Sequence, residues 1–414
     1  MTRYVARLVD ATLDELIAEV PAILLTGPRA SGKTTTARRL VKTVVQLDRP
    51  EVGAMFRTNP DAALRQVEEP ALLDEWQEAP EVIGALKRAV DADPRPGRFV
   101  LTGSASADLA GATWPGTGRI IRVPMYGMTE REVQHRAVGP GFLDRLLAAN
   151  TDWSIGGEAL DIDDYVSLAL RSGFPEPALR LGARAQRRWL EAYIEECCTR
   201  DALSEQGGRD PVLLRRWLTA LATNTASVVD DKVLYDAAQL DRRTAAAYET
   251  SFETIGVTER VPAYATNRLK RLIERPKRYM VDPAIAAAAL AVDTRAVLHD
   301  ANLLGRLIDT YVVSQLRAEL AVSDARGRLY HLRTDAGRHE CDLIIDLGHR
   351  GIVAIEIKAA GAPTPRDARH LNWLADELGE SFVGGVVFHT GPYAIDLSDR
   401  IVALPIAWLW SERS

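Results

Sequence analysis

Short apolar runs alternate with helical or turn-rich sequence through the first third of the chain. Each run has the length of a strand, and the stretches between runs leave room for helices. The runs are Ala22–Leu25, Val44–Asp48, Pro70–Glu75, Arg98–Ser104 and Arg119–Val123. This alternation predicts an α/β domain over residues 1–150, built on a parallel sheet. Ligand chemistry is expected where the carboxyl ends of such strands meet.

The middle of the chain, residues 156–301, has a helical pattern broken by glycine and proline. Within it, Lys232–Leu240 and Thr244–Ile255 are predicted helices joined by a short turn. Two runs, Val261–Ala265 and Arg278–Val281, follow as predicted strands of a hairpin. Two helices followed by a hairpin predict a winged helix.

The last part, residues 302–414, starts with a helix whose apolar positions between Leu304 and Leu316 fall on one face. Three strands, a helix and a fourth strand are expected to follow, in the order α-β-β-β-α-β. Their predicted ranges are 329–333, 342–347, 352–357, 366–378 and 383–388. The whole chain is therefore expected to be an α/β protein with three regions.

Composition narrows the class of protein. The chain has 414 residues, of which 47% are hydrophobic and 26% charged, as in a soluble globular protein with two or three domains. The net charge of −6 means that a surface for nucleic acid must be a local patch. The three cysteines form no CxxC pair, which argues against a zinc site and a disulfide framework and suits a reduced cytoplasm. The sequence has neither a secretory apolar segment nor a run long enough to span a membrane, so a cytoplasmic location is expected.

A phosphate-binding loop is the strongest motif. The segment from Gly27 to Thr34 fits GxxxxGK[ST] and follows the first apolar run. The glycines let the backbone approach phosphates, Lys33 reaches the β and γ phosphates, and the Thr34 hydroxyl can bind Mg²⁺. We therefore expect ATP and Mg²⁺ as cofactors. The predicted nucleotide-contacting residues of this loop are Gly27, Pro28, Arg29, Ala30, Ser31, Gly32, Lys33, Thr34 and Thr35.

Polar residues follow two later strands. Asp74 and Glu75 end the run Leu72-Leu73 and suggest a Walker B strand, in which Asp74 holds Mg²⁺ and Glu75 polarises the attacking water. Thr102 and Ser104 end the next strand, where a hydroxyl can bond the γ-phosphate. The alternatives are an ordinary structural strand end for the first pair and a capped turn for the second.

Arginines near the loop are candidates for neutralising phosphate charge. Arg119 could act in its own subunit or in a neighbouring one, which makes assembly into a homo-oligomer one expectation. Arg29, inside the loop, is a second candidate. The alternative for Arg119 is a solvated arginine at a strand edge.

A basic tract lies between and beside the two predicted hairpin strands. Six cations face one acid, Glu274, so the tract is a candidate strip for contacting nucleic-acid phosphates, with DNA favoured over RNA. The alternative is a solvated loop or a surface that docks on the first domain. The six cations are Arg268, Lys270, Arg271, Arg275, Lys277 and Arg278.

The motifs in their order resemble a known family. Gly-Pro-Arg-x-x-Gly-Lys-Thr, then Leu-Asp-Glu, then Leu-Thr-Gly-Ser is similar to bacterial and archaeal AAA-type ATP-binding proteins with a C-terminal region of unassigned function. Later segments extend the resemblance over nearly the whole chain: Ser172–Glu176, Arg200-Asp201, Lys277–Asp282 and Leu304–Asp309. The resemblance implies a P-loop ATPase domain, a helical middle and a nuclease-like end, but no settled biological role. The middle is expected to combine a helical lid with the winged helix predicted above.

The C-terminal order of elements resembles the core of restriction-endonuclease-like, PD-(D/E)XK enzymes. Their chemistry uses carboxylates that hold Mg²⁺ and a lysine that activates water. Asp342, Glu356 and Lys358 match that set, and Asp309 is a further metal-ligand candidate where the family usually has Glu. Cys341 is expected to serve packing. The alternative is an amphipathic edge strand, which produces Ile-Glu-Ile-Lys without any site.

Two main functions remain open from the sequence, and a signalling or defence ATPase that uses neither nucleic-acid feature is a third alternative. One is Mg-dependent ATP hydrolysis that licenses nucleic-acid binding and phosphodiester cleavage by the C-terminal domain. The other is a nucleotide-controlled switch whose nuclease-like domain binds DNA or a protein without cutting.

Overall fold

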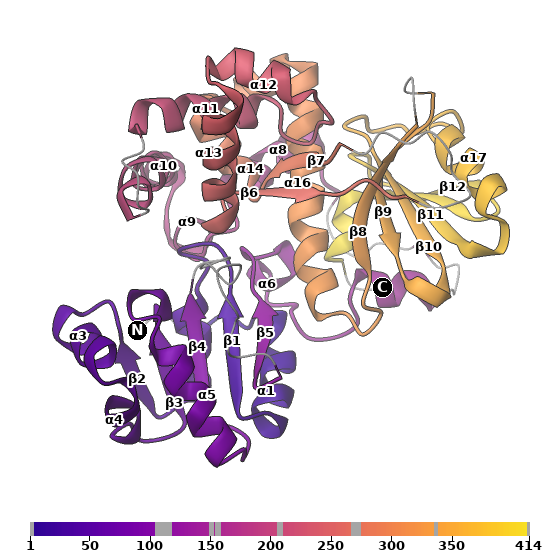
Figure 1. Cartoon of the computed structure of the whole chain (residues 1–414). Helices are drawn as coiled ribbons and strands as arrows, with labels where there is room; N and C mark the ends of the chain where they lie inside the picture. The colour runs from indigo at the N-terminus through magenta and orange to yellow at the C-terminus, as the bar shows by residue number, and fades with distance from the viewer. Residues whose placement is uncertain are drawn as a thin grey trace.

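The computed structural model describes residues 4–103, 118–148, 153, 159–204, 210–265, 275–334 and 338–411. Figure 1 shows an N-terminal α/β domain in indigo and violet, a mostly helical region in magenta and red, and a second α/β domain in orange and yellow. The long helix α16 (Ala301–Val322) stands between the last two.

The N-terminal domain is built on a five-stranded sheet in the order β2-β3-β4-β1-β5. Every neighbouring pair is parallel, so the predicted parallel α/β sheet is confirmed. Its elements are α1 (Val9–Glu19), β1 (Ala22–Thr26), α2 (Lys33–Ala37), η1 (Arg38–Leu40), β2 (Thr43–Gln46), α3 (Pro50–Thr58), α4 (Pro60–Arg65), β3 (Ala71–Asp74), η2 (Trp76–Glu78), α5 (Val82–Ala92), β4 (Phe99–Gly103) and β5 (Ile120–Pro124).

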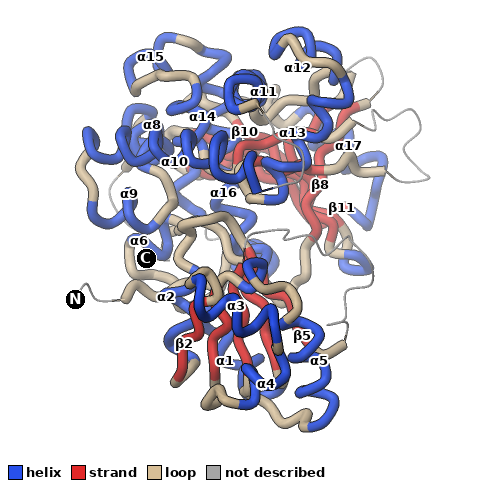
Figure 2. The backbone as a smooth tube through the Cα atoms, turned by 60° about the vertical axis from the view of Figure 1, so that its left-hand side comes forward, coloured by secondary structure: helices blue, strands red, loops and turns tan. Residues whose placement is uncertain are grey.

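Helices cover both faces of this sheet, as Figure 2 shows. Leu24 joins a core that includes Leu86 of α5, whereas its neighbour Ile23 joins a second core that includes Leu13 of α1. Successive side chains of a strand point to opposite faces. Burial on both faces explains why the inner strands β1, β3 and β4 are mostly apolar instead of alternating.

The middle region consists mainly of helices and one hairpin. Asp230 and Asp241 cap α12 and α13, and β6 pairs antiparallel with β7. The two helices and the hairpin occupy the expected part of the chain, and their identification as a winged helix stays a prediction. The elements are α6 (Glu130–Val133), α7 (Phe142–Leu147), α8 (Ile162–Arg171), α9 (Pro175–Arg180), α10 (Ala183–Ser204), α11 (Pro211–Thr223), α12 (Asp231–Ala238), α13 (Arg242–Thr254), β6 (Thr258–Val261), β7 (Lys277–Met280), α14 (Pro283–Ala289) and α15 (Thr294–His299).

The first hairpin strand was predicted too late in the chain. It runs over Thr258–Val261, and the residues after it pair with β8 (Arg328–Arg333) instead of β7. The Tyr264 amide donates to the His331 carbonyl at 2.7 Å, and the His331 amide donates to the Pro262 carbonyl at 3.0 Å. The middle region therefore covers the edge of the C-terminal sheet.

The C-terminal domain holds a six-stranded sheet in the order β12-β13-β11-β10-β9-β8. Strands β8, β9 and β10 form an antiparallel meander, while β11 lies parallel to β10. The expected order α-β-β-β-α-β is present, and β12 and β13 extend it. The elements after α16 and β8 are β9 (Glu340–Asp346), η4 (Gly348–Arg350), β10 (Ile352–Ile357), α17 (Arg369–Leu378), η5 (Gly379–Ser381), β11 (Phe382–His389), β12 (Ile395–Ser398), β13 (Ile401–Pro405) and η6 (Ile406–Leu409).

One core joins the middle region to the C-terminal sheet. Ile355 and Ile357 of β10 belong to the same buried cluster as Leu316 of α16 and Trp217 of α11. The opposite face of the sheet packs under α17, where Cys341 is fully buried, in agreement with its predicted packing role. Helix α16 packs against the helices of the middle region and against β10, so the middle region and the C-terminal sheet share one hydrophobic core.

Candidate functional site

The phosphate loop lies between β1 and α2, at the carboxyl edge of the first sheet. A Cβ on Gly27 would lie 1.9 Å from the Met125 carbonyl oxygen, so no other residue fits there. Gly32, at φ 97°, is in the left-handed region that favours glycine. Gly27 is thus required by close packing, and Gly32 by its backbone conformation.

Lys33 is folded back onto the loop. Its Nζ donates to the carbonyls of Gly27 at 3.0 Å and Pro28 at 2.8 Å. Burial lowers the pKa of this lysine to about 8, although Glu75 and Asp74 counteract part of the effect. The ammonium therefore lies in the loop with backbone carbonyls as partners, where the phosphates of a bound nucleotide would be stronger ones.

Asp74 collects hydroxyl groups from two other segments. The Thr34 hydroxyl donates to Asp74 Oδ1 at 2.8 Å, and the Thr102 hydroxyl of β4 donates to the same oxygen. Asp74 is buried at the end of β3. A carboxylate and a hydroxyl side by side are oxygen ligands of the kind Mg²⁺ takes from proteins that bind it together with substrate phosphates. The residues present therefore fit an Mg²⁺ ion at this edge.

Glu75 is held apart from Asp74 by its backbone. It adopts φ 54°, in the left-handed region, and its carboxylate accepts a hydrogen bond from the Gln77 amide. Unlike Asp74, it is half-buried. Gln77 carries no motif signal in the sequence, so its contact with Glu75 was missed.

Arg7, which precedes α1, holds the phosphate loop through hydrogen bonds to backbone carbonyls. Its guanidinium donates to the Ser31 carbonyl at 2.9 Å and the Tyr126 carbonyl at 2.8 Å, and it pairs with Glu132 at 2.9 Å. Sequence analysis missed Arg7 because it precedes the first strand and belongs to no motif. Its contacts link the loop to α6.

Helix α10 contacts the phosphate loop at Arg29. The Tyr193 hydroxyl donates to the Arg29 carbonyl at 3.5 Å, and Arg29 pairs with Glu196 at 3.2 Å. Tyr193 stacks on Trp189, with ring centroids 5.3 Å apart. The stacked aromatic pair of α10 is thus combined with a contact to the phosphate loop.

Arg119 was predicted wrongly as a nucleotide contact of its own subunit. It precedes β5, whose first residue Ile120 pairs with Ala22 at the start of β1, and it forms an ion pair with Asp91. The loop follows the opposite end of β1, about 16 Å away at 3.3 Å per residue. The structure describes one chain, so the neighbouring-subunit role of Arg119 stays a prediction.

The other predicted loop residues differ in exposure. Pro28 and Ser31 are buried, whereas Ala30 and Thr35 are exposed. Ser104 lies outside the described residues.

A second polar site lies in the C-terminal domain. We call Asp309 of α16, Asp342 of β9 and Glu356 of β10 the acid cluster. Lys277 of β7 enters it: its Nζ lies 2.6 Å from Asp309 Oδ2 and 2.9 Å from Asp342 Oδ1. Lys358 pairs with Glu356 at 2.6 Å. The structure therefore brings together all four residues predicted for this site and adds a lysine that was assigned elsewhere.

The acid cluster is largely shielded from water. Burial raises the pKa of Asp309 to about 7 and that of Glu356 to about 8. Burial alone would lower the pKa of Lys277, but Asp309 and Asp342 outweigh it and raise that pKa well above its usual value. Burial would likewise raise the pKa of Asp342, yet the Lys277 ammonium holds it below its usual value. Lys277 contributes most to this lowering of the Asp342 pKa, and the Ile357 amide and Lys358 add to it.

The metal set predicted at Asp309, Asp342 and Glu356 is not assembled as ligands. Within the described residues, no group of three or more His, Cys, Asp or Glu side chains is placed to hold a metal ion. The physical reason is Lys277, whose ammonium stands between the two aspartates.

The acid cluster opens into a pocket of about 520 Å³. Cationic side chains share its lining with the carboxylates, and two of them, Arg366 and Arg369, are exposed. The cationic and histidine residues of the lining are Arg306, Lys358, Arg366, Arg369 and His370.

The predicted basic strip is not a continuous surface. Lys277 is 2% exposed, and Arg278 is buried against Glu249 and Asp231, at 2.6 Å from each. Both were wrongly assigned to the strip, because their partners come from distant segments. Arg275 pairs with Asp230 at 2.8 Å. Arg268, Lys270 and Arg271 lie outside the described residues.

Three consecutive charged residues of α6 form a polar junction between the regions. Glu130 pairs with Arg171 of α8, Arg131 with Glu319 of α16 at 2.8 Å, and Glu132 with Arg7 at 2.9 Å. All three α6 residues are buried. The junction joins the phosphate-loop support to the helix that carries Asp309.

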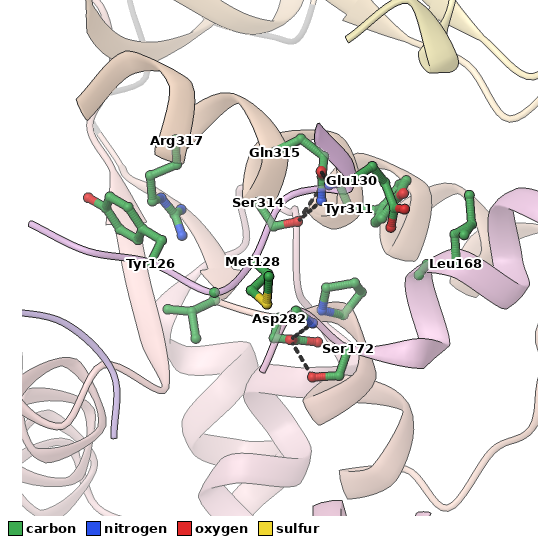
Figure 3. Close-up of a pocket in the computed structure, with 15 residues that line it drawn as sticks. Tyr126, Met128, Glu130, Leu168, Ser172, Asp282, Tyr311, Ser314, Gln315 and Arg317 are labelled. Carbon is green, nitrogen blue, oxygen red and sulfur yellow. Dashed lines mark hydrogen bonds between the residues drawn. The ribbon is translucent and has the colours of Figure 1, made fainter. Parts of the chain in front are cut away.

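Figure 3 shows a small cavity beside the polar junction, of about 20 Å³. Gln315 of α16 accepts a hydrogen bond from the Glu130 amide at 2.8 Å, and Asp282 accepts one from the Ser172 hydroxyl at 2.7 Å. Residues from all three regions line it. Its size suits about one water molecule, so the segments are closely packed here.

Comparison with known families assigns the N-terminal domain. Residues 19–134 match the family described as AAA domain. Residues 162–296 and 304–409 match two families described as Domain of unknown function, DUF8612 and DUF4143. Together with the loop geometry, the first match identifies an AAA-type P-loop domain.

Among curated proteins, the chain is 29% identical to the Uncharacterized protein Rv2008c of Mycobacterium tuberculosis over 401 residues, 95% of this chain and 82% of that protein. The Uncharacterized protein Mb2031c of Mycobacterium bovis matches to the same extent.

Among solved structures, the Walker-type ATPase PABY2304 of Pyrococcus abyssi is similar at a TM-score of 0.42 with 15% identity, over 68% of this chain and 94% of that one. A RuvB variant of Thermotoga maritima is similar at a TM-score of 0.30 with 19% identity, over 61% of this chain and 89% of that one.

In the described part of the chain, none of the helices combines the length and the apolar character needed to cross a bilayer.

Proposed function

We propose that the chain binds Mg-ATP at the phosphate loop and hydrolyses it. The observation that carries this proposal is the meeting of Thr34, Asp74 and Thr102 at one carboxylate oxygen beside a buried lysine. Three separate segments supply these groups. A structural strand end does not need a hydroxyl from each neighbour and an adjacent lysine held only by carbonyls.

Each residue has a task in hydrolysis. Lys33 leaves the Gly27 and Pro28 carbonyls for the β and γ phosphates, where its charge is better satisfied. Thr34 and Asp74 would hold Mg²⁺, which neutralises the phosphate charge that develops in the transition state. Glu75 leaves Gln77 and orients the attacking water as general base.

The Glu75→Gln variant tests this assignment. It should bind Mg-ATP but turn it over about 10²- to 10⁴-fold more slowly, the range expected for loss of a general base. Glu78→Gln is the matched control, since Glu78 is exposed on the same turn. Equal turnover by wild type and Glu75→Gln would remove Glu75 from the mechanism.

The proposal includes transmission of the nucleotide state to the other two regions. Arg7 donates to the Ser31 carbonyl of the loop and pairs with Glu132 of α6. Helix α6 in turn forms ion pairs with α8 and α16. A change in loop conformation has a contiguous, buried path of ion pairs along which to act.

A second function is proposed for the C-terminal domain: it binds nucleic acid, with DNA favoured over RNA. The α-β-β-β-α-β order and the pocket of about 520 Å³ with exposed Arg366 and Arg369 support it. Arginine side chains suit phosphate contacts because their planar guanidinium groups can donate two parallel hydrogen bonds.

The double variant Arg366→Glu/Arg369→Glu tests this binding. It should weaken retention of a short DNA duplex in anisotropy titrations and reduce the slope of log K against log salt by about two units, close to one for each phosphate contact. The matched control is Arg184→Glu/Arg187→Glu, an exposed pair with the same spacing on α10. Equal affinity and slope in both double variants would contradict the proposal, and a single-stranded RNA probe decides between the two nucleic acids.

A further inference from the structure

The acid cluster already contains a cation that belongs to the protein. Lys277 comes from β7 of the middle region and not from the C-terminal domain. Its side chain is 2% exposed, and its Nζ contacts Asp309 at 2.6 Å and Asp342 at 2.9 Å. A buried ammonium between two carboxylates compensates charges that would otherwise be costly to remove from water.

Five of the six oxygens in the acid cluster accept a hydrogen bond or ion pair from the protein. Asp309 accepts from Lys277 and from the Tyr279 hydroxyl at 2.9 Å. Asp342 accepts from Lys277 and from the Ile357 amide at 2.9 Å. Glu356 accepts from Lys358 through Oε1, and its buried Oε2 has no partner among the described residues. One unpartnered oxygen is too few to coordinate Mg²⁺, which needs several oxygen ligands in near-octahedral geometry.

We propose that the Lys277 ammonium permanently takes the place that a divalent cation would have in the acid cluster, so that this nuclease-like site is metal-free and does not cut nucleic acid. The inference rests on the proposed function in one respect, that the C-terminal domain is a nucleic-acid binder. On this proposal the C-terminal domain binds nucleic acid without cleaving it, and the Lys277 ammonium compensates the negative charge of the acid cluster.

The residues around Lys277 fix it in place, which distinguishes permanent replacement from a removable block. Arg278 is buried with Glu249 and Asp231 at 2.6 Å from each, and the Met280 amide donates to Thr225 at 3.0 Å. Tyr279 is buried and bonded to Asp309 itself. These contacts hold β7 in place, and the Lys277 side chain is itself buried and paired with Asp309 and Asp342, so its withdrawal would leave those two carboxylates without their cation.

An ammonium cannot reproduce what a metal ion does in phosphodiester cleavage. Two of the three N–H donors of Lys277 point to the carboxylates of Asp309 and Asp342. The Nζ also lies 3.5 Å from the Asp342 backbone carbonyl, which accepts from the third donor. A catalytic metal needs open coordination positions for a phosphate oxygen and for water. Lys277 therefore has no open position for a phosphate oxygen, whereas Arg366 and Arg369 of the pocket lining are exposed.

Titration with Mn²⁺ in the absence of nucleotide tests the proposal on the full chain. Asp74→Asn serves as the background, so that the ATPase domain contributes no ion. Unbound Mn²⁺ is followed by electron paramagnetic resonance. We expect no Mn²⁺ to be taken up by the Asp74→Asn protein. Adding Lys277→Met should create a site that binds Mn²⁺ at least 10-fold more tightly than any residual uptake by Asp74→Asn. Adding Asp342→Asn as well should remove that site again. The matched control Lys232→Met, an exposed lysine on α12, should create none.

Two results would overturn the proposal. One is Mn²⁺ uptake by the Asp74→Asn protein that is lost on adding Asp342→Asn, and the other is nicking of plasmid DNA by the wild-type chain that disappears in Glu356→Ala. Neither depends on whether the Lys277 variant folds. ATP hydrolysis and DNA retention by the wild-type preparation report separately on the proposed function, so its failure is distinguishable from the presence of a metal at the acid cluster.

Discussion

Lys33 is held in a state that a bound triphosphate would change. With a pKa of about 8, it is mostly neutral above that pH in the free protein. Phosphate oxygens favour the charged form and raise the pKa again. Binding of ATP must then be accompanied by uptake of a proton wherever the free lysine is neutral.

Proton uptake should therefore depend on pH. Calorimetric titrations of Mg-ATP in buffers of different ionisation enthalpy should show uptake of roughly 0.9 proton at pH 9 and roughly 0.1 at pH 7, given the pKa of about 8. The sign follows because the pKa is lowered in the free state and raised in the complex, so affinity falls as pH rises above 8. A proton count that does not change between these pH values would contradict the assignment.

At the scale of residues, motif chemistry was predictable and long-range partners were not. Lys33, Thr34 and Asp74 carry their roles in local sequence, and the structure gathers them. Lys277 belongs to a basic tract in the sequence, which suggested an exposed surface. Its partners, Asp309 and Asp342, lie 32 and 65 residues away, a pairing that only the fold reveals.

At the scale of elements, α6 carries three consecutive buried charged residues, each of which forms an ion pair with another segment. Its Arg131 and Glu319 of α16 are both buried, and such a pair is strongly destabilised when only one partner is removed. Replacing both partners with apolar residues is far less harmful, because no uncompensated charge remains.

The Arg131→Met variant should lose about 3–5 kcal/mol of unfolding free energy, and adding Glu319→Leu should restore most of it. Urea unfolding followed by tryptophan fluorescence provides the measurement. Arg119→Met, which removes an exposed ion pair, should change stability by no more than about 1 kcal/mol. Similar losses in the Arg131 single and double variants would show that packing and not charge compensation governs this contact.

Element boundaries were predicted best where periodicity alone decides them. Strands β1, β3 and β4 of the first sheet are buried on both faces and were recognisable as apolar runs. The start of β6 was misplaced because Pro262–Tyr264 is extended too, but it pairs with β8 of another region. Strands β12 and β13 were missed; β12 carries only one partly buried position, Leu397, in four residues.

At the scale of the molecule, the polar junction predicts long-range coupling. In the Glu75→Gln protein, Mg-ATP should slow amide hydrogen exchange not only in the phosphate loop but also in α6 and α16. Adding Arg7→Met should preserve protection of the loop at saturating ATP and abolish it in α16, because Arg7 is the contact between the loop and Glu132. Arg95→Met, in an exposed arginine, is the control.

Exchange in α16 that is identical with and without Mg-ATP would contradict this coupling. The junction could not be predicted from the sequence, since buried charged residues in a short helix have the same pattern as a solvated turn. The order of the three regions, by contrast, followed from apolar periodicity and from glycine and proline positions.

The most direct test of the account is calorimetric titration of Mg-ATP into the nucleotide-free chain. We expect saturable binding by the wild type and affinity reduced about 10- to 100-fold in Lys33→Ala, the loss expected when a charged hydrogen-bond donor is removed. Lys42→Ala, in an exposed lysine just beyond the loop helix, should bind like the wild type. Absence of binding by well-folded wild-type protein, or equal binding by Lys33→Ala, would contradict the central claim.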